Sequence, residues 1–166
     1  MIDSRGLLRY NEADLHTDER SRIMSTVTIR SLTIGDGHCR VIVPLVADCY
    51  EDVVRDAAAL AAQKPDMIEW RADYIAELRY NHELLVRCLQ RIRRRIGEIP
   101  LLVTWRTQKE GGQMDLTAED YEAFCRVVCE SGCADLLDVE LKPTRYPTKI
   151  SGVYVCRLTI TAARTP

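Results

Sequence analysis

Two kinds of hydrophobic pattern alternate along the chain from residue 40 onward. Short apolar runs, rich in β-branched residues, have the length of buried strands; they lie at residues 41–46, 66–73, 101–106, 136–141 and 153–158. Between the first four runs, apolar residues recur every three or four positions, which predicts amphipathic helices at residues 51–63, 82–96 and 117–132. Strands alternating with helices through short links predict parallel βαβ units. The chain is therefore expected to be an α/β protein with four to five such units.

Local signals at the ends of the helices support this prediction. Pro65 stops the helix at residues 51–63, because proline cannot continue the helical hydrogen bonding. Thr117, followed three residues later by Asp120, is a start similar to a capping box. These signals place the loops that join strands to helices.

The segment ahead of the first long strand has a different character. Residues 27–30 and 32–34, followed by Gly35-Asp36-Gly37, predict a small β-hairpin before the main fold. Residues 1–23 are polar and without pattern, and we expect a disordered leader or a start assigned too early. Residues 24–166 are then the single folded domain. The pattern alone does not separate half of a barrel from an open, doubly wound sheet, but no Gly-x-Gly-x-x-Gly or Walker sequence follows the first long strand.

Charged residues occur with a period of two near the ends of three predicted strands. Side chains two apart share one side of a strand, so the charged set faces away from the apolar set; the charged or polar set is Glu69, Arg71, Asp73, Thr104, Arg106, Asp138 and Glu140. In a barrel this side would face the axis at the carboxyl end, where barrel enzymes place their active sites. Two arginines facing one cavity suit a small, polyoxygenated anion. For Asp73, Asp138 and Glu140, a structural ion-pair network remains the alternative.

Composition narrows the range of functions. Of the 166 residues 46% are hydrophobic and 29% charged, the net charge is −2, and a soluble cytoplasmic protein is the default expectation. No apolar run is long enough to cross a bilayer, so no membrane partner is expected. An arginine run at residues 91–95 lies at the end of a predicted helix, where cations complement the helix dipole, so nucleic-acid binding is not expected.

The chain has seven cysteines, an odd number without the spacing of a disulfide framework. Cys125, Cys129 and Cys133 recur every four residues, but no fourth zinc ligand is suggested nearby. We interpret the cysteines as small buried hydrophobic residues, and expect no metal site.

Four motifs together resemble the type I 3-dehydroquinate dehydratase family in order and spacing. They are Glu69-Trp70-Arg71-Ala72-Asp73-Tyr74, Thr104-Trp105-Arg106-Thr107, Lys109-Glu110-Gly111-Gly112 and Asp138-Val139-Glu140-Leu141. The segment from Met24 to Gly37 is similar to the natural start of that family and its hairpin across the barrel floor. The resemblance implies that residues 24–166 form an incomplete (β/α)₈ barrel domain, the N-terminal portion of such an enzyme, truncated before its later strands.

The resemblance implies a reaction and roles for several residues. The family converts 3-dehydroquinate to 3-dehydroshikimate and water, without a metal or organic cofactor, through a Schiff base between a lysine and the ketone, while a histidine moves the proton. Glu69, Arg71 and Arg106 would contact the substrate, and Glu110 would orient the catalytic histidine. A serine that often touches substrate is replaced here by Pro44.

The sequence departs from the family where the catalytic groups are expected. Ile160 occupies the position of the histidine, and the strand that carries the Schiff-base lysine is absent. Four lysines are present, all in predicted loops or at the ends of elements: Lys64, Lys109, Lys142 and Lys149. We therefore expect this chain to be inactive alone and to form a homodimer if it is stable. The alternative is a non-catalytic protein that binds a shikimate-like ligand.

Overall fold

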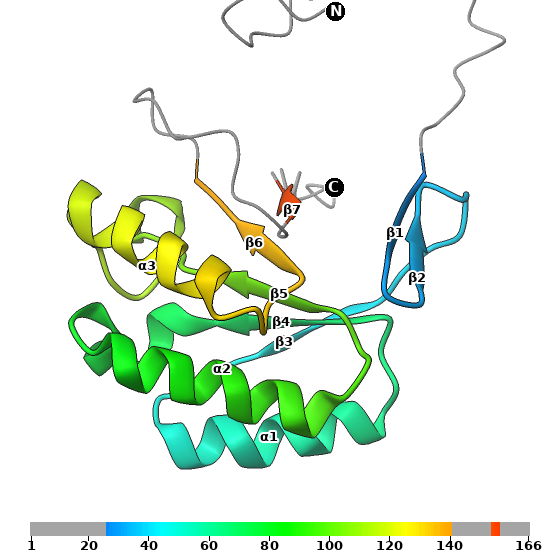
Figure 1. Ribbon diagram of the computed structural model, residues 1–166, viewed down its shortest axis with the longest axis horizontal. Helices are drawn as coiled ribbons and strands as arrows, with labels where there is room; N and C mark the ends of the chain where they lie inside the picture. Colours follow the sequence, from blue (N-terminus) through cyan, green and yellow to red (C-terminus); the bar gives the residue numbers. More distant parts are fainter. Residues whose placement is uncertain (1–25, 141–153, 157–166) are drawn as a thin grey trace, which may run out of the picture.

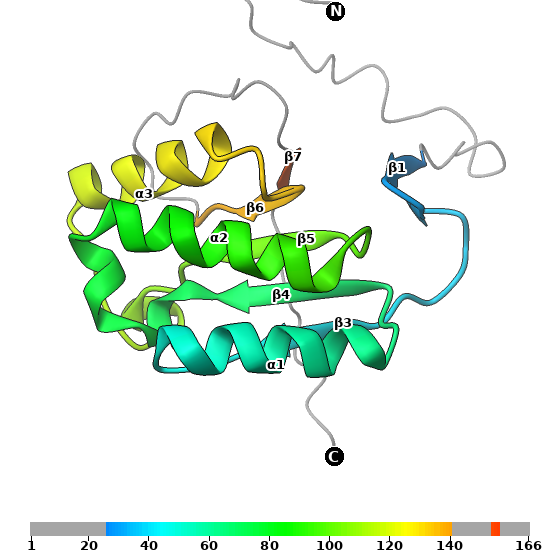
Figure 2. The same ribbon diagram turned by 60° about the horizontal axis from the view of Figure 1, so that its bottom comes forward.

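The computed structural model describes residues 26–140 and the strand β7 (Tyr154–Cys156). Five strands form one parallel sheet in the sequential order β3-β4-β5-β6-β7. The other four are β3 (Ile42–Leu45), β4 (Met67–Arg71), β5 (Leu101–Thr104) and β6 (Leu136–Asp138). Figures 1 and 2 show three helices as one layer on the same side of the sheet: α1 (Tyr50–Ala62), α2 (His82–Ile96) and α3 (Ala118–Glu130).

The strand order decides between the two architectures that the sequence left open. A doubly wound sheet reverses its strand order at one point and carries helices on both faces. Here the strands follow one another without reversal and the helices cover one face, which is the arrangement of a barrel wall. The prediction of a partial (β/α)₈ barrel with an N-terminal hairpin is confirmed.

The main core lies between the sheet and the helix layer. Trp70 on β4 and Trp105, just after β5, are fully buried, and the Trp105 ring packs edge-on against Phe124 of α3 with centroids 5.2 Å apart. Helix α2 contributes the stripe that its sequence predicted: Leu85, Cys88, Leu89, Ile92 and Ile96 are all buried. Cys125 and Cys129 of α3 belong to the same core, which confirms their interpretation as small hydrophobic residues.

The helix ends follow the local sequence signals closely. The Thr117 side chain accepts the N–H of Asp120 at the start of α3, as predicted, and the Asn81 side chain caps α2 by accepting the N–H of Leu84. Helix α1 ends at Ala62, one residue before the predicted end, and Lys64 adopts a left-handed φ of 52° before the chain turns into Pro65.

The hairpin covers the amino-terminal end of the parallel strands, opposite the end that carries the charged residues. Strands β1 (Val27–Ile29) and β2 (Leu32–Ile34) pair antiparallel, as predicted. Ile29 and Leu32 form a second apolar cluster with three residues from the inner face of the sheet: Met67, Leu102 and Leu136. The hairpin turn is tied down by Arg30, whose Nε donates to Asp135 over 2.7 Å.

Arg93 corrects one detail of the sequence analysis. It belongs to the arginine run that the sequence placed at the end of a helix, and Arg91, Arg94 and Arg95 are exposed there. The Arg93 guanidinium instead turns inward, where its Nη2 donates to Asp135 and its Nε to the carbonyl of Cys133. Fewer arginines are therefore free on this surface than the sequence suggested.

No helix in the described part of the chain is both long and apolar enough to span a bilayer.

Strands β4, β5 and β6 end two or three residues earlier than the sequence predicted. Strand β4 stops at Arg71, β5 at Thr104 and β6 at Asp138. The reason is that the backbone beyond these points leaves the sheet: Asp73 enters the short turn η2 (Ala72–Tyr74), and the Thr107 N–H donates to a Glu140 side chain rather than to a strand. The predicted leader at residues 1–23 lies outside the described residues, as does Leu141.

Candidate functional site

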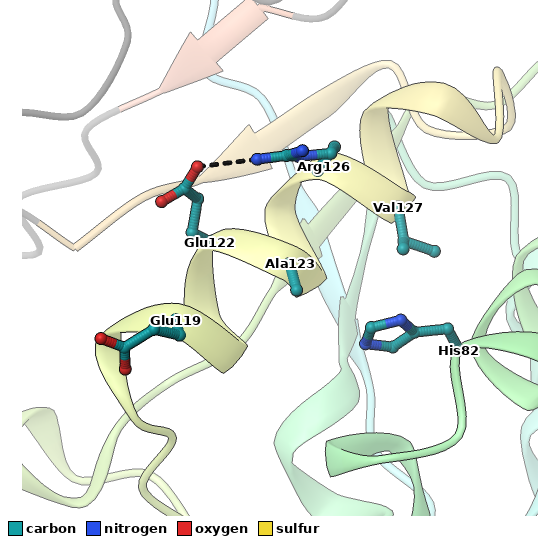
Figure 3. Close-up of a pocket in the computed structure, with 6 residues that line it drawn as sticks. All are labelled: His82, Glu119, Glu122, Ala123, Arg126 and Val127. Atoms are coloured by element: carbon teal, nitrogen blue, oxygen red, sulfur yellow. Dashed lines mark hydrogen bonds and ion pairs between the residues drawn. The ribbon is translucent and has the colours of Figure 1, made fainter.

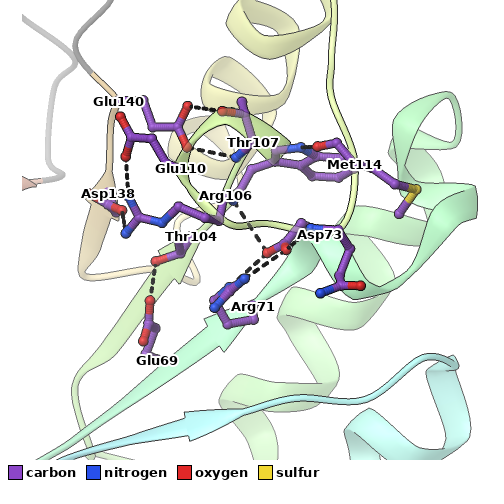
Figure 4. A network of polar contacts seen from close by, with 12 residues as sticks. Glu69, Arg71, Asp73, Thr104, Arg106, Thr107, Glu110, Met114, Asp138 and Glu140 are labelled. Carbon is purple, nitrogen blue, oxygen red and sulfur yellow. Dashed lines mark hydrogen bonds and ion pairs between the residues drawn. The ribbon is translucent and has the colours of Figure 1, made fainter.

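Polar side chains gather where β4, β5 and β6 end, as the alternation of charges predicted (Figure 4). The strand register places Arg71 beside Thr104, and Thr104 beside Asp138. The side chains of the opposite parity, such as Trp70 and Val103, are fully buried in the core toward the helices. One face of the sheet is thus apolar and covered, and the other carries charge at its carboxyl end.

Arg71 and Asp73 form a two-pronged ion pair. The Nε and Nη2 atoms of Arg71 each donate over 2.9 Å to separate oxygens of Asp73. Burial alone would raise the pKa of the Asp73 carboxyl, but the hydrogen bonds from Arg71 and from two backbone N–H groups outweigh it and hold that pKa below its ordinary value. Asp73 is therefore an anion at neutral pH.

Arg106 lies between two carboxylates. Its Nη1 donates to Glu110 over 2.7 Å and its Nη2 to Asp138 over 2.6 Å. Asp138 is almost completely buried, and this burial raises the pKa of its carboxyl, with the neighbouring Glu69 and Glu140 adding to the effect. Glu110 is half exposed, so the site opens to solvent on its side.

Glu69 points to the same face and accepts the hydroxyl hydrogen of Thr104 over 2.8 Å. Its strand neighbour on β3 is Pro44, the residue that stands where the resemblance implies a serine. All four site residues named from the sequence, Glu69, Arg71, Arg106 and Glu110, thus lie on neighbouring elements within one polar network (Figure 4). Such an arrangement can hold a small ligand that has several hydroxyls and a negative charge.

The histidines and lysines of the described residues lie away from the centre of this network. His38 follows the hairpin and Lys64 lies between α1 and β4, both at the opposite end of the strands. His82 begins α2 and faces a shallow groove against α3, beside Ala123 and Val127 (Figure 3). Lys109 is exposed on the loop that carries Glu110. Lys142, Lys149 and Ile160 lie outside the described residues.

The structure adds contacts that the sequence analysis missed. Asp73 accepts the backbone N–H groups of Arg106 and Gln113, and Glu140 accepts both the N–H and the hydroxyl of Thr107. These contacts support the structural alternative for Asp73 and Glu140. The Gly111-Gly112 pair was the signal in the sequence for a tight loop at this place.

One group of possible metal ligands lies in the loop after β3. The ligand atoms of Asp48, Cys49 and Asp52 are within 4.8 Å of one another. Asp52 is already paired with Arg55, Asp48 is exposed, and Cys49 and Asp52 are only partly buried. This group is therefore no basis for assigning a metal. Burial raises the pKa of the Cys125 thiol to about 12, so it stays protonated and is a poor metal ligand.

Comparison with known proteins identifies the family. The model of the family described as type I 3-dehydroquinase matches residues 41–153. The chain belongs to this family. It is 37% identical over 118 residues to the 3-dehydroquinate dehydratase of Enterococcus faecalis and 39% identical over 118 residues to that of Salmonella agona, in each case over 71% of this chain and 46% of the relative. The chain thus spans about half the length of these curated relatives.

Solved structures of 3-dehydroquinate dehydratases have the same fold. The enzyme from Clostridium difficile, of type I, matches with a TM-score of 0.67 at 32% identity, over 70% of this chain and 46% of the other. The enzyme from Geobacillus kaustophilus matches with a TM-score of 0.66 at 30% identity, over 69% and 45%. This chain therefore corresponds to a part of a (β/α)₈ barrel.

Proposed function

We propose that this chain provides the substrate-binding part of a 3-dehydroquinate dehydratase site, which converts 3-dehydroquinate to 3-dehydroshikimate and water. The observation that supports this most directly is the convergence of Glu69, Arg71 and Arg106 at the carboxyl ends of neighbouring strands. These residues lie in the motifs that resemble the family, and the curated relatives are named for this reaction. No metal or organic cofactor enters the proposal.

Each of these side chains has a defined task in the proposed site. Arg71 and Arg106 each keep one side-chain nitrogen outside the ion pairs with Asp73, Asp138 and Glu110, and that nitrogen can donate to a hydroxyl or carboxylate of the substrate. Glu69 can accept a hydroxyl of the substrate. Glu110 would orient a histidine, and holds Arg106 in this chain.

Turnover needs two further groups. The reaction requires an amine to form a Schiff base with the ketone and a base to remove the neighbouring proton. Within residues 26–140, His82 lines the groove against α3 and Lys109 is exposed on a loop. Ile160 stands at the position of the family's histidine. We therefore propose that the 166-residue chain binds substrate without converting it.

Incubation of the purified chain with 3-dehydroquinate tests this proposal. Absorbance of the enone product follows turnover, and borohydride followed by mass analysis traps an imine. We expect neither product nor adduct, and activity only when the remaining half of a related barrel is supplied as a second polypeptide. Turnover or a trapped adduct with the chain alone would show that one of its own lysines forms the Schiff base, and would contradict the proposal of inactivity.

The alternative from the sequence is a non-catalytic protein that binds a shikimate-like ligand. The retention of Glu69, Arg71 and Arg106 in one network is compatible with it. The same experiment separates the two: a binding protein would take up the ligand but stay inactive when the second half is added. Nucleic acid is not a proposed partner, and the cytoplasmic location stays a prediction.

A homodimer is the proposed assembly. In the described residues β3 pairs only with β4, so its other edge has unpaired N–H and C=O groups. Ile42 and Val46 are 39% and 41% exposed on or next to this strand. A second copy would cover these groups. Light scattering coupled to size-exclusion chromatography should give twice the monomer mass, whereas a stable monomer that unfolds cooperatively would contradict this assembly.

A further inference from the structure

The loop between β5 and α3 carries two of the four site residues, Arg106 and Glu110. Its shape is set by a tight turn: the carbonyl of Thr107 accepts the N–H of Glu110 over 3.0 Å and that of Gly112 over 2.8 Å. Glu110 ends the short helix η4 (Gln108–Glu110) that this turn creates. The positions of Arg106 and Glu110 therefore depend on how residues 106–113 are held against the strands.

Asp73 holds both ends of this loop. Its Oδ1 accepts the N–H of Arg106 over 3.3 Å, at the start of the loop, and its Oδ2 accepts the N–H of Gln113 over 3.1 Å, at the end. Each oxygen also accepts one N–H from Arg71. Two acceptor bonds at each oxygen use the four lone-pair positions of a carboxylate. Asp73 is completely buried and has no position left for a ligand.

Glu140 holds the same loop from the opposite side. Its Oε1 accepts the N–H of Thr107 and its Oε2 accepts the Thr107 hydroxyl, both over 2.7 Å. Both residues are buried, at 5% and 2% exposure. The backbone N–H of Glu140 in turn donates to the hydroxyl of Tyr121 on α3. The loop is thus fixed by one carboxylate following β4 and another following β6.

Gly112 shows how closely the loop folds on itself. A Cβ at this position would lie 1.8 Å from the carbonyl oxygen of Arg106. Only glycine lets the returning end of the loop pass the backbone of Arg106 at this distance. The loop therefore has one tightly specified shape, in which the Arg106 side chain extends between Asp138 and Glu110.

We propose that Asp73 and Glu140 are positioning residues: they clamp the loop of residues 106–113 so that Arg106 and Glu110 face the ligand. This assignment rests on the proposed function for its purpose, while the clamp itself is a property of the fold. Asp73 and Glu140 touch no ligand themselves. Glu140 acts through the loop, and Asp73 acts through the loop and also holds the Arg71 side chain. Asp138, by contrast, contacts the Arg106 side chain directly.

Hydrogen exchange and proteolysis test the clamp without any ligand. In Asp73→Asn, an N–H₂ group replaces one carboxylate oxygen and faces an N–H donor of the loop, with which it cannot form a hydrogen bond. The ion pair with Arg71 is also lost. We expect exchange at the Arg106 and Gln113 amides, and trypsin cleavage after the exposed Lys109, to be at least about ten times faster. Asp115→Asn is the matched control, because exposed Asp115 accepts the N–H of Gln108 in the same loop over 3.0 Å. It should change both rates less than about two-fold. Equal rates in Asp73→Asn and wild type would overturn the proposal.

Glu140→Gln provides a second variant if Asp73→Asn fails to fold. Glutamine keeps an oxygen for the N–H of Thr107 but offers an N–H₂ to its hydroxyl, which can rotate to accept. A smaller acceleration, about two- to five-fold, is expected at the Thr107 amide. Unchanged exchange at the Thr107 amide would show that Glu140 does not hold the loop.

Affinity for 3-dehydroquinate tests whether the clamp acts through Arg106. Asp73→Asn should weaken binding about ten-fold in the wild-type background but only about three-fold in Arg106→Lys, because the loss through Arg106 is then absent while the loss through Arg71 remains. A full ten-fold loss in both backgrounds would show that Asp73 acts through Arg71 and not through the loop, and would overturn its role in the clamp. If the wild type binds no 3-dehydroquinate, the proposed function fails, and the exchange experiment alone decides the clamp.

Discussion

At the scale of single residues, two buried tryptophans differ in whether the indole N–H has a hydrogen-bond partner. Trp70 and Trp105 are both fully buried in the same core. The Nε1–H of Trp105 donates to the carbonyl of Met114 over 3.1 Å, which pins the loop before α3. The Nε1–H of Trp70 has no partner within the described residues. A buried donor without a partner costs free energy, so only Trp105 gains from its polar atom.

This difference predicts unequal effects of the same substitution. Trp70→Phe removes ring volume and an unpaired donor, whereas Trp105→Phe removes ring volume and a hydrogen bond. We expect Trp105→Phe to lower the free energy of unfolding by about 1 kcal/mol more than Trp70→Phe. Urea denaturation of the two variants measures this. A larger loss in Trp70→Phe would mean that its Nε1–H has a partner in solution.

The lowered pKa of Asp73 predicts that the stability of the fold depends on pH. Its pKa is lower in the folded protein than its ordinary value of 3.8, so the folded state releases this proton more readily than the unfolded chain. The resulting stability is present above pH 3.8 and is lost as the pH falls through the lowered pKa. The difference in unfolding free energy between wild type and Asp73→Asn should therefore shrink as the pH falls from 7 to about 3. A difference that stays constant over this range would contradict the assignment of a lowered pKa.

At the scale of elements, the sequence predicted the helices better than the ends of the strands. The α2 helix lies at the predicted residues, because its stripe and its ends are local properties of the chain. The end of β4 at Arg71 was not predictable in this way. The period of two continues to Asp73 in the sequence, and only the folded loop shows that the Asp73 side chain bonds backbone N–H groups from another element. Charge alternation thus located the site, and non-local hydrogen bonds determined its shape.

The Gly111-Gly112 pair allows a test of the loop with neighbouring substitutions. Gly111 has a left-handed φ of 85°, and a Cβ added there would meet no atom within 4 Å, so Gly111→Ala should cost about 1 kcal/mol of stability through backbone strain alone. Gly112→Ala would place a methyl group on the Arg106 carbonyl and should cost about 1–3 kcal/mol more. Thermal unfolding of both variants gives the comparison. Equal costs would show that the loop does not approach Arg106 as closely as described.

At the scale of the whole molecule, strand order and the hairpin reveal what the local pattern could not. Without the family resemblance, the alternation of strands and helices did not distinguish a barrel wall from an open sheet. The structure shows a barrel wall, because the strands follow one another in sequential order with the helices on one side. Ile29 and Leu32 of the hairpin cover the amino-terminal end of the strands. The same arrangement brings Glu69, Arg71 and Arg106 to one end of the sheet.

Calorimetric titration of 3-dehydroquinate into the chain tests the central claim, that this end of the sheet binds the substrate of the family. We predict binding with one ligand per site, weakened at least about ten-fold in Arg106→Lys, because lysine cannot replace the guanidinium fork. Arg126→Lys is the matched control, since Arg126 forms a similar pair with a glutamate four residues away but lies exposed on α3. The affinity of Arg126→Lys for 3-dehydroquinate should equal that of the wild type. Absence of binding by the wild-type chain, or equal binding by Arg106→Lys, would contradict the account.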